Sequence, residues 1–228
     1  MLKITFHGQA CFEIASASSA ILIDPFFTGN PLADIAPADV KCDAVLVSHG
    51  HGDHLGDAIQ IAIHNNALVI ATYELACYLQ KHGVKVHPMH VGGGHDFPFG
   101  RVKLTPASHG GMIDADGGAY FTVPCGFLIR MEDKTIYHAG DTGLLADMEL
   151  LGHYNEIDLA LLPIGDNFTM GPEDALIAVK LLKPRLVVPM HYNTFNLIAQ
   201  DPHAFRTRVE SETDSKCRVV APGESIEL

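Results

Sequence analysis

The chain has 228 residues, of which 47% are hydrophobic and 18% are charged, and its formal net charge is -12. This composition is typical of a globular protein and excludes a disordered chain, while apolar runs shorter than about 18 residues argue against a membrane span. The negative charge argues against unaided binding to nucleic acid or anionic membranes, which require clusters of Lys and Arg. The length fits a single domain over residues 1–228.

The first half of the chain alternates apolar runs with turns. It starts on a strand-like run at Leu2, without the apolar segment or the cleavage site of a signal peptide, so no signal peptide is expected. Alternating or continuous apolar runs predict strands, and apolar spacings of three and four residues predict helices. The predicted strands are 2–6, 11–14, 20–23, 44–47, 68–71, 84–86 and 102–106, and the predicted helices are 55–65 and 73–82.

The second half repeats this scheme. A hairpin is predicted from strands 125–131 and 135–138, and later segments follow the order of the first half. The matching segments are 11–25 with 126–141, 42–49 with 157–164, and 66–72 with 185–191. This similarity suggests two related β-rich halves, although any α/β protein can produce such echoes. Two such halves would pack sheet against sheet with helices outside, as an α/β protein with a four-layer αββα sandwich.

The five cysteines are scattered along the chain and form no CxxC pair. A disulfide framework or a thiolate zinc site is therefore not expected. We predict a cytoplasmic protein in which the cysteines have ordinary packing roles.

Four side chains that can bind a metal follow the predicted strand 44–47 within six positions: His49, His51, Asp53 and His54. Gly50 and Gly52 lie between them and allow the loop to wrap tightly. Imidazole and carboxylate together suit zinc, manganese, iron or nickel. We therefore interpret the segment as the start of a metal site, in preference to a polar loop with incidental histidines.

These four residues cannot complete the coordination of two ions, so further ligands are expected directly after other strands. His109, Asp141 and His191 each follow a predicted strand, and a two-sheet sandwich would bring these strand ends together. Asp24 and His138 are the main rivals. Asp24 is expected to hydrogen-bond the 49–54 loop and His138 to point into packing, both outside direct contact with an ion.

The spaced H-x-H-x-D-H motif, followed by single His, Asp and His residues, resembles the metallo-β-lactamase superfamily over the whole chain. The segments ITFHGQACFEI, HAGDTG, LLPIGDNFTMGPEDA and VVPMHYNTF are similar to its small metal-dependent hydrolases, a branch related to ascorbate-phosphate lactonases. The resemblance implies an αββα fold and a site for up to two divalent ions, with zinc first and manganese, iron or nickel as alternatives.

The resemblance also implies how the ions are shared. His49, His51 and His109 would bind one ion; Asp53, His54 and His191 would bind the other; and Asp141 would bridge them. Gln9 departs from the family pattern, in which His is common, and this argues against a direct role of the turn in metal binding; His7 is expected either to support the ligands or to have a structural role.

Loops beside the ions are expected to contact the substrate. Segment 165–175 offers Asn167 and Thr169 before a helix that starts at Pro172, and Asn193 and Thr194 follow His191. A capping role for Thr169 is an equal alternative. Phe168, Met170 and Phe195 either line an apolar wall or pack in the core, and the glycine-rich segment 110–124 is a candidate mobile loop near the site.

We therefore expect a metal-dependent hydrolase, with two ions, that uses metal-activated hydroxide on a small ester, lactone or phosphoester. Asp53 would act catalytically as well as bind metal. The substrate is a small molecule and can be anionic, and a homo-oligomer is compatible with the sequence. The alternatives are a nuclease or phosphodiesterase on the same scaffold, a non-enzymatic metal-binding module, and redox chemistry at a di-iron site, which is disfavoured because the motif keeps all its histidines.

Overall fold

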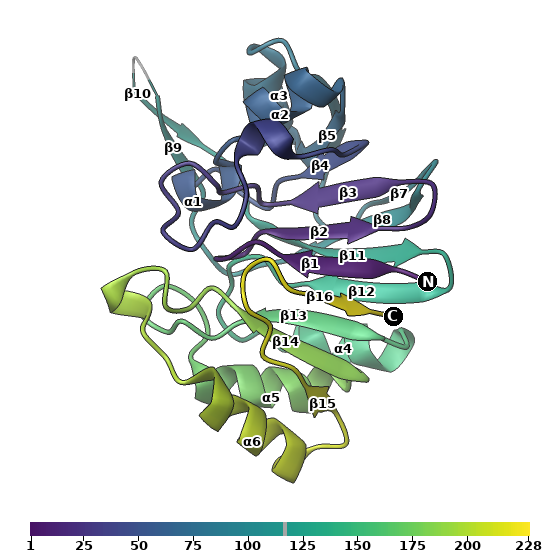
Figure 1. Cartoon of the computed structure of the whole chain (residues 1–228), viewed down its shortest axis with the longest axis vertical. Helices are drawn as coiled ribbons and strands as arrows, with labels where there is room; N and C mark the ends of the chain where they lie inside the picture. The colour runs from purple at the N-terminus through teal and green to yellow at the C-terminus, as the bar shows by residue number, and fades with distance from the viewer. Residues whose placement is uncertain (116–117) are drawn as a thin grey trace.

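The N-terminal sheet is built from short strands whose apolar residues face the interior. The computed structural model describes residues 1–115 and 118–228 (Figure 1). The strands of this sheet lie in the order β16-β1-β2-β3-β4-β5-β6. Their bounds are β1 (Lys3–Phe6), β2 (Phe12–Ala15), β3 (Ala20–Ile23), β4 (Ala44–Leu46), β5 (Leu68–Thr72), β6 (Lys85–Met89) and β16 (Ser225–Glu227).

The second sheet has the order β15-β14-β13-β12-β11-β8-β7. Its strands are β7 (Gly94–Phe97), β8 (Gly100–Pro106), β11 (Cys125–Met131), β12 (Lys134–His138), β13 (Leu159–Pro163), β14 (Leu186–Met190) and β15 (Lys216–Cys217). Strands β11 and β12 pair antiparallel and β12, β13 and β14 pair in parallel, just as β2 and β3 pair antiparallel and β3, β4 and β5 pair in parallel. The segments matched in the sequence therefore occupy equivalent places in the two sheets.

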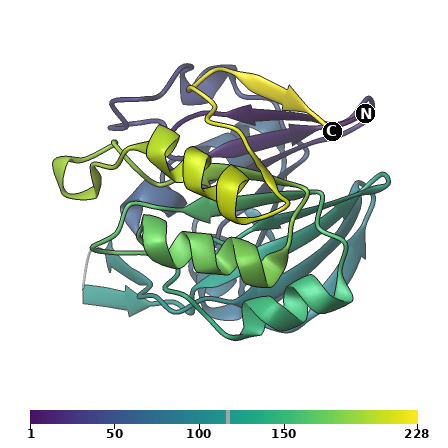
Figure 2. The same cartoon turned by 90° about the horizontal axis from the view of Figure 1, so that it is seen from below.

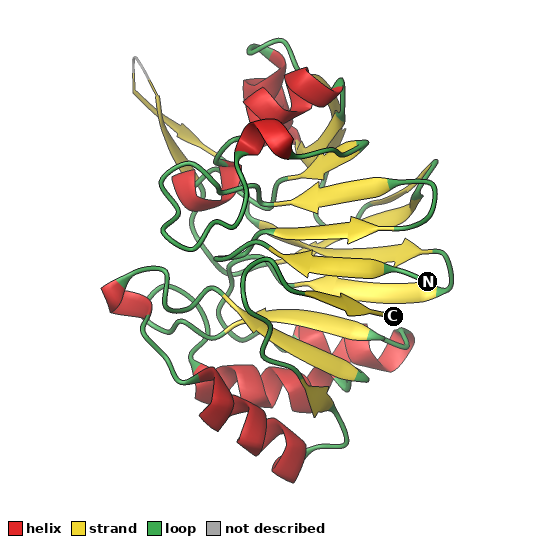
Figure 3. Cartoon of the chain, in the orientation of Figure 1, coloured by secondary structure: helices red, strands yellow, loops and turns green. Residues whose placement is uncertain are grey.

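Helices cover the outer face of each sheet (Figures 1 and 3). Helices α2 (Ala58–Asn65) and α3 (Tyr73–Gln80) pack on the first sheet. Helices α4 (Asp147–Tyr154), α5 (Pro172–Leu182) and α6 (Pro202–Glu212) cover the second, and Figure 2 shows them side by side. The αββα sandwich predicted from the sequence is confirmed, and no helix in the described residues is long and apolar enough to cross a membrane.

The main core lies between the two sheets. Ile4, Phe12 and Ile14 of the first sheet pack against Phe127 and Ile129 of the second, and all five are essentially inaccessible to solvent. Burying a side chain of this size contributes about 1.5–3 kcal/mol, so this interface holds the halves together. Four of the five cysteines are also buried, and all five are free thiols in the described residues.

The structure corrects the sequence prediction in three places. The helix predicted over 55–65 is interrupted at Gly56 between α1 (Gly52–Leu55) and α2, because Gly56 has φ 40° and lies against the backbone of Pro25. Strands β7, β15 and β16 and helices α4 and α6 were not predicted. Segment 110–124, expected as a mobile loop, contains the paired strands β9 (Met112–Ala115) and β10 (Gly118–Phe121), and residues 116–117 lie outside the described part.

Parallel pairing places the carboxyl ends of β3 and β4 at one edge of the first sheet, and those of β12, β13 and β14 at one edge of the second. In Figure 1 the arrowheads of β3 and β13 point toward the side where α1 lies. The loop after β12 turns at Gly140, which has φ 61° and whose missing side chain leaves room for the carbonyl oxygen of Cys125 and for Ser48. This close approach joins the loop after β12 to the loop after β4.

Gly140→Ala should destabilise the protein by about 3 kcal/mol, because an added Cβ would lie 2.5 Å from the Cys125 oxygen and the left-handed backbone is unfavourable for alanine. Gly92→Ala is the matched control. Gly92 has φ 90° but no atom within 4 Å of the added Cβ, so only the backbone cost of about 1 kcal/mol is expected. Urea unfolding of both variants measures the difference, and equal losses would contradict the packing argument.

Candidate metal centre

The structure brings all seven predicted ligand side chains together where loops of the two sheets meet. They form three overlapping groups whose ligand atoms lie within 4.8 Å of one another. The groups are His49, His51 and His109; His49, His54 and Asp141; and Asp53, His54 and His191. Each group combines residues that follow the first sheet's strands with residues that follow the second's.

Asp141 lies between the outer two groups. Its Oδ2 atom is 3.4 Å from His109 Nε2 and 3.0 Å from His191 Nε2. The same oxygen is 3.2 Å from His54 Nε2. This central position is compatible with the bridging role that the family resemblance implies.

Several buried ligand atoms in this cluster make no hydrogen bond to the described residues: His54 Nε2, His191 Nε2 and Asp141 Oδ1. A buried polar atom without a partner costs about 1–3 kcal/mol, so their convergence calls for a group that binds imidazole nitrogen and carboxylate oxygen at once. A divalent ion such as zinc or manganese has that preference. The donor set therefore fits the metal that the sequence suggested.

The buried carboxylate of Asp24 orients two of the histidines. Ser48 donates to Asp24 from its backbone N–H (2.7 Å) and its hydroxyl (2.6 Å), and His54 Nδ1 donates to Asp24 Oδ2 (2.8 Å). Because the Ser48 hydroxyl has already given its proton to Asp24, His49 Nδ1 donates to Ser48 Oγ (2.9 Å). Both histidines are consequently protonated on Nδ1, so Nε2 is the nitrogen that faces the cluster and would bind an ion.

Gln9 has a supporting role that the sequence did not reveal. Its side chain is fully buried, its Nε2 donates to Asp53 Oδ2 (2.8 Å), and its backbone oxygen accepts from the N–H of His191 (2.7 Å). Gln9 thus fixes one carboxylate and one imidazole of the same group. The contact joins residues 44 positions apart, so no local pattern could have indicated it.

The charges within the cluster shift the pKa values of its members. Burial lowers the pKa of His191, but the neighbouring Asp141 carboxylate prevails and raises it to about 9. Burial would raise the pKa of Asp141 and of Asp53, yet the positive charge on His54 holds both well below the usual range. Burial, together with the charge on His54, lowers the pKa of His49, so this imidazole is neutral and could bind an ion.

Asp24 and His138, the alternative candidates for metal ligands, lie where the sequence analysis expected them. Asp24 bonds the 49–54 loop, and His138 lies between the sheets, where Nε2 donates to the Ala10 oxygen and Nδ1 accepts from the N–H of Gly140. His138 therefore supports the turn that presents Asp141. His7 pairs with Asp34 (2.7 Å) and stays outside the cluster.

Only some residues of the loops predicted to contact the substrate line the cavity beside the cluster. Phe168 and Phe195 line a cavity above the cluster, whereas Met170 is fully buried in the core. Thr169 does not cap α5, whose N-cap is Gly171, and instead donates to the Met170 oxygen. Asn193 accepts from the N–H of Gln200, which closes its own loop.

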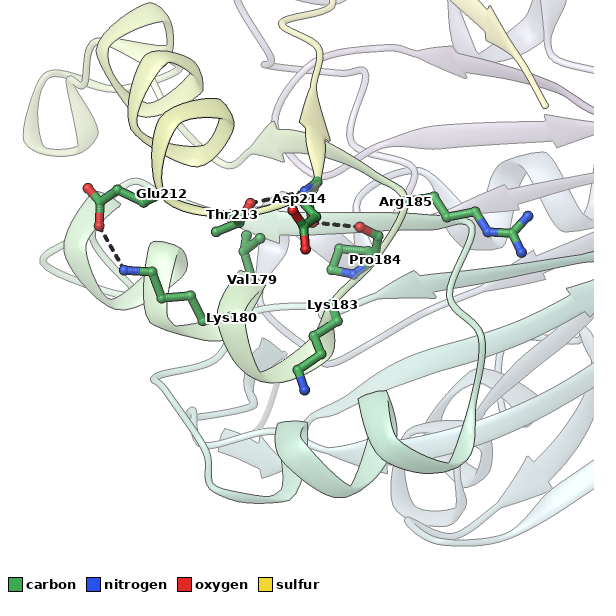
Figure 4. Close-up of a pocket in the computed structure, with 9 residues that line it drawn as sticks. Val179, Lys180, Lys183, Pro184, Arg185, Glu212, Thr213 and Asp214 are labelled. Carbon is green, nitrogen blue, oxygen red and sulfur yellow. Dashed lines mark hydrogen bonds and ion pairs between the residues drawn. The ribbon is translucent and has the colours of Figure 1, made fainter.

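A second hollow, of about 340 Å³, lies at the end of α5 beside β15 and carries no comparable chemistry (Figure 4). Lys180 is paired with Glu212 (2.7 Å), and Figure 4 shows Lys183 and Arg185 pointing in different directions. A helix carboxyl end also disfavours anions. The basic side chains therefore do not make an anion site.

Comparison with known proteins agrees with this geometry. A family model described as a beta-lactamase superfamily domain matches residues 3–191. A protein of Pelotomaculum thermopropionicum is 58% identical over 100% of both chains, and one of Heliobacterium modesticaldum is 56% identical over 100% of this chain and 98% of its own. A solved structure from the archaeon Ignicoccus hospitalis is 38% identical, with a TM-score of 0.90 over 99% of this chain and 97% of its own.

The chain therefore belongs to the metallo-β-lactamase superfamily. Within that class it is similar to the two bacterial relatives, each named a UPF0173 metal-dependent hydrolase, and to the archaeal structure, described as a novel metallo hydrolase.

Asp24→Asn should weaken metal binding about 10–100-fold, because asparagine has one acceptor oxygen and cannot accept all three hydrogen bonds from Ser48 and His54. Asparagine keeps the size and tolerates the left-handed backbone at this position, where φ is 46°. Competition with a chromogenic chelator measures the affinity.

The control is Asp57→Asn, which alters another buried carboxylate that accepts from Phe27 and Thr28 and touches none of the seven ligands. It should leave metal affinity unchanged. Equal weakening in both variants would show that Asp24 acts through general stability only.

Metal affinity should also rise with pH at least as far as about 9, because His54 and His191 both have raised pKa values. The raised pKa keeps His191 protonated below that value, and an ion must displace the proton before it can bind the imidazole. Each proton displaced makes the apparent affinity fall about tenfold per pH unit below pH 9. Titration calorimetry of chelator-treated protein in buffers of different ionisation enthalpy counts the protons released, and a count of zero at pH 7 would contradict the assignment.

Proposed function

We propose that the protein is a metal-dependent hydrolase acting on a small ester, lactone or phosphoester, with two divalent ions and zinc as the first candidate. The observation that supports this most directly is the convergence of seven His and Asp side chains beneath an accessible cavity of about 550 Å³. Ions held there would lower the pKa of a bound water to near neutrality and polarise the substrate oxygen.

Residues of the chain would have two roles in the reaction: to bind the ions and to transfer the proton. His49, His54 and Asp141 are buried, which suits ligands that stay bound to the ions throughout the reaction. Asp53 is 27% exposed and borders the cavity. We assign to Asp53, oriented by Gln9, the transfer of the proton from the attacking water to the leaving oxygen.

The alternatives receive less support from the site. A nuclease would need basic side chains along its groove, and the cavity lining, as far as the structure describes it, contains neither Lys nor Arg. A non-enzymatic metal-binding module would enclose its ions, whereas His51, Asp53 and His109 here border an open cavity. We retain the cytoplasm as the proposed compartment.

Removal of metal should abolish hydrolysis, and addition of one metal should restore it. His51→Ala and Asp141→Ala should each release metal and reduce turnover more than about 10³-fold while leaving most of the fold intact. His64→Ala, at an exposed histidine of α2, is the control and should retain both metal and activity. Elemental analysis, circular dichroism and a panel of lactones, esters, thioesters and phosphodiesters test these outcomes. Full activity in either ligand variant would rule out the assigned site.

A further inference from the structure

Three phenylalanine side chains form the wall of the cavity above the metal centre. The cavity is lined by Phe26, Phe168 and Phe195 together with Gly52 and the ligands His51, Asp53, His109, Asp141 and His191. Phe168 is 53% exposed and Phe195 is 43% exposed. Large exposed apolar side chains grouped around a cavity mark a binding surface for an apolar group.

The three rings come from separate loops, each held by its own hydrogen bonds. The backbone of Phe26 donates to the Asp24 oxygen (2.8 Å) and accepts from Asn30 Nδ2 (2.9 Å). Phe195 accepts from the N–H of Ile198 (3.1 Å), and its ring lies 6.4 Å from that of Phe26 at an angle of 37°.

The loop of Phe168 is closed in the same way. The N–H of Phe168 donates to the Asp166 oxygen, and the next residue donates to the same oxygen (3.2 Å). Because all three loops are ordered by internal contacts, a ligand would not have to order them on binding, which favours affinity.

Charge in the described lining is confined to the ligand residues. Beyond His51, Asp53, His109, Asp141 and His191, the lining consists of Gly52 and the three phenyl rings. A charged group on the substrate, away from its reacting centre, would therefore meet no opposite charge among these side chains. An uncharged flat group would contact ring faces, with which it can stack or pack edge to face.

We propose that Phe26, Phe168 and Phe195 bind an uncharged aromatic group attached close to the reacting carbonyl of an ester, thioester or lactone. This inference rests on the proposed hydrolase function and specifies its substrate class. In the reaction the water oxygen bonds to the carbonyl carbon, the acyl C–O or C–S bond breaks, and the water's proton passes to the leaving oxygen or sulfur, so one water is consumed. The rings bind the aromatic group and exclude solvent from it.

Binding can be measured by fluorescence, because the chain contains no tryptophan and a single introduced one would be the only indole fluorophore. A product-like probe avoids turnover during the titration. Phe168→Trp places a single fluorophore in the wall, and titration with phenylacetate, as a product-like probe, should change its emission with an affinity at least tenfold tighter than that for acetate. Adding Phe195→Ala to this variant should weaken phenylacetate about tenfold and leave acetate unchanged. Tyr154→Trp, on the exposed end of α4, is the matched control and should show no change in emission.

Kinetics give a second readout. With methyl phenylacetate and phenyl acetate, which carry the ring on opposite sides of the ester, Phe195→Ala should raise KM about tenfold for at least one, with kcat nearly constant. Methyl acetate should be unaffected.

The outcomes separate the two proposals. Equal affinity for phenylacetate and acetate, or equal KM effects on aromatic and methyl esters, would overturn the aromatic site even if hydrolysis is metal-dependent. A smaller oligomeric state in Phe195→Ala than in the unaltered protein, with phenylacetate binding unchanged, would assign the rings to a contact between subunits and would also overturn it. Failure of every ester, thioester, lactone and phosphodiester to react would overturn the proposed hydrolase, while the fluorescence titration would still decide whether the aromatic site exists.

Discussion

The candidate metal centre depends on one buried carboxylate, that of Asp24, which lies outside the seven proposed ligands. Asp24 lies wholly out of solvent at the end of β3, and removing such a group from water costs several kcal/mol. Three hydrogen bonds from Ser48 and His54 offset that cost, and the same bonds determine which nitrogen of His49 and His54 faces the cluster. The Asp24 carboxylate would weaken the fold if it were unpaired. Through its hydrogen bonds it instead fixes the orientation of two proposed ligands, His49 and His54.

The topology of the two sheets brings together proposed ligands that are distant in the chain, which the hydrogen bonds of Asp24 alone could not do. The first sheet contributes the 49–54 loop, and the second contributes His109, Asp141 and His191. Each of the three ligand groups takes members from both sheets, so neither half contains a complete site. The same division applies to the cavity wall, where Phe26 belongs to the first half and Phe168 and Phe195 belong to the second.

The sequence predicted the sandwich and the place of every proposed ligand because those features follow from local patterns: apolar runs, and His or Asp directly after them. It also predicted that Asp24 would bond the ligand loop. It could not predict Gln9 on Asp53, since that contact depends on how two distant turns meet. It missed α6 because few of that helix's residues are apolar, with only Phe205 and Val209 buried. The pairing of β9 with β10 escaped notice because both strands are short and the glycines at 110, 111 and 118 interrupt the alternation of apolar residues.

The division of the ligands between two sheets has a consequence for the resilience of the molecule. An ion bound by His109 or His191 together with the 49–54 loop would cross-link the two sheets at the edge where their loops meet. Since such an ion binds the folded chain far better than the unfolded one, its supply would set the melting temperature by mass action. At low metal concentration the protein would lose activity, and the edge where the loops of the two sheets meet would also unfold locally more often and become more susceptible to proteolysis.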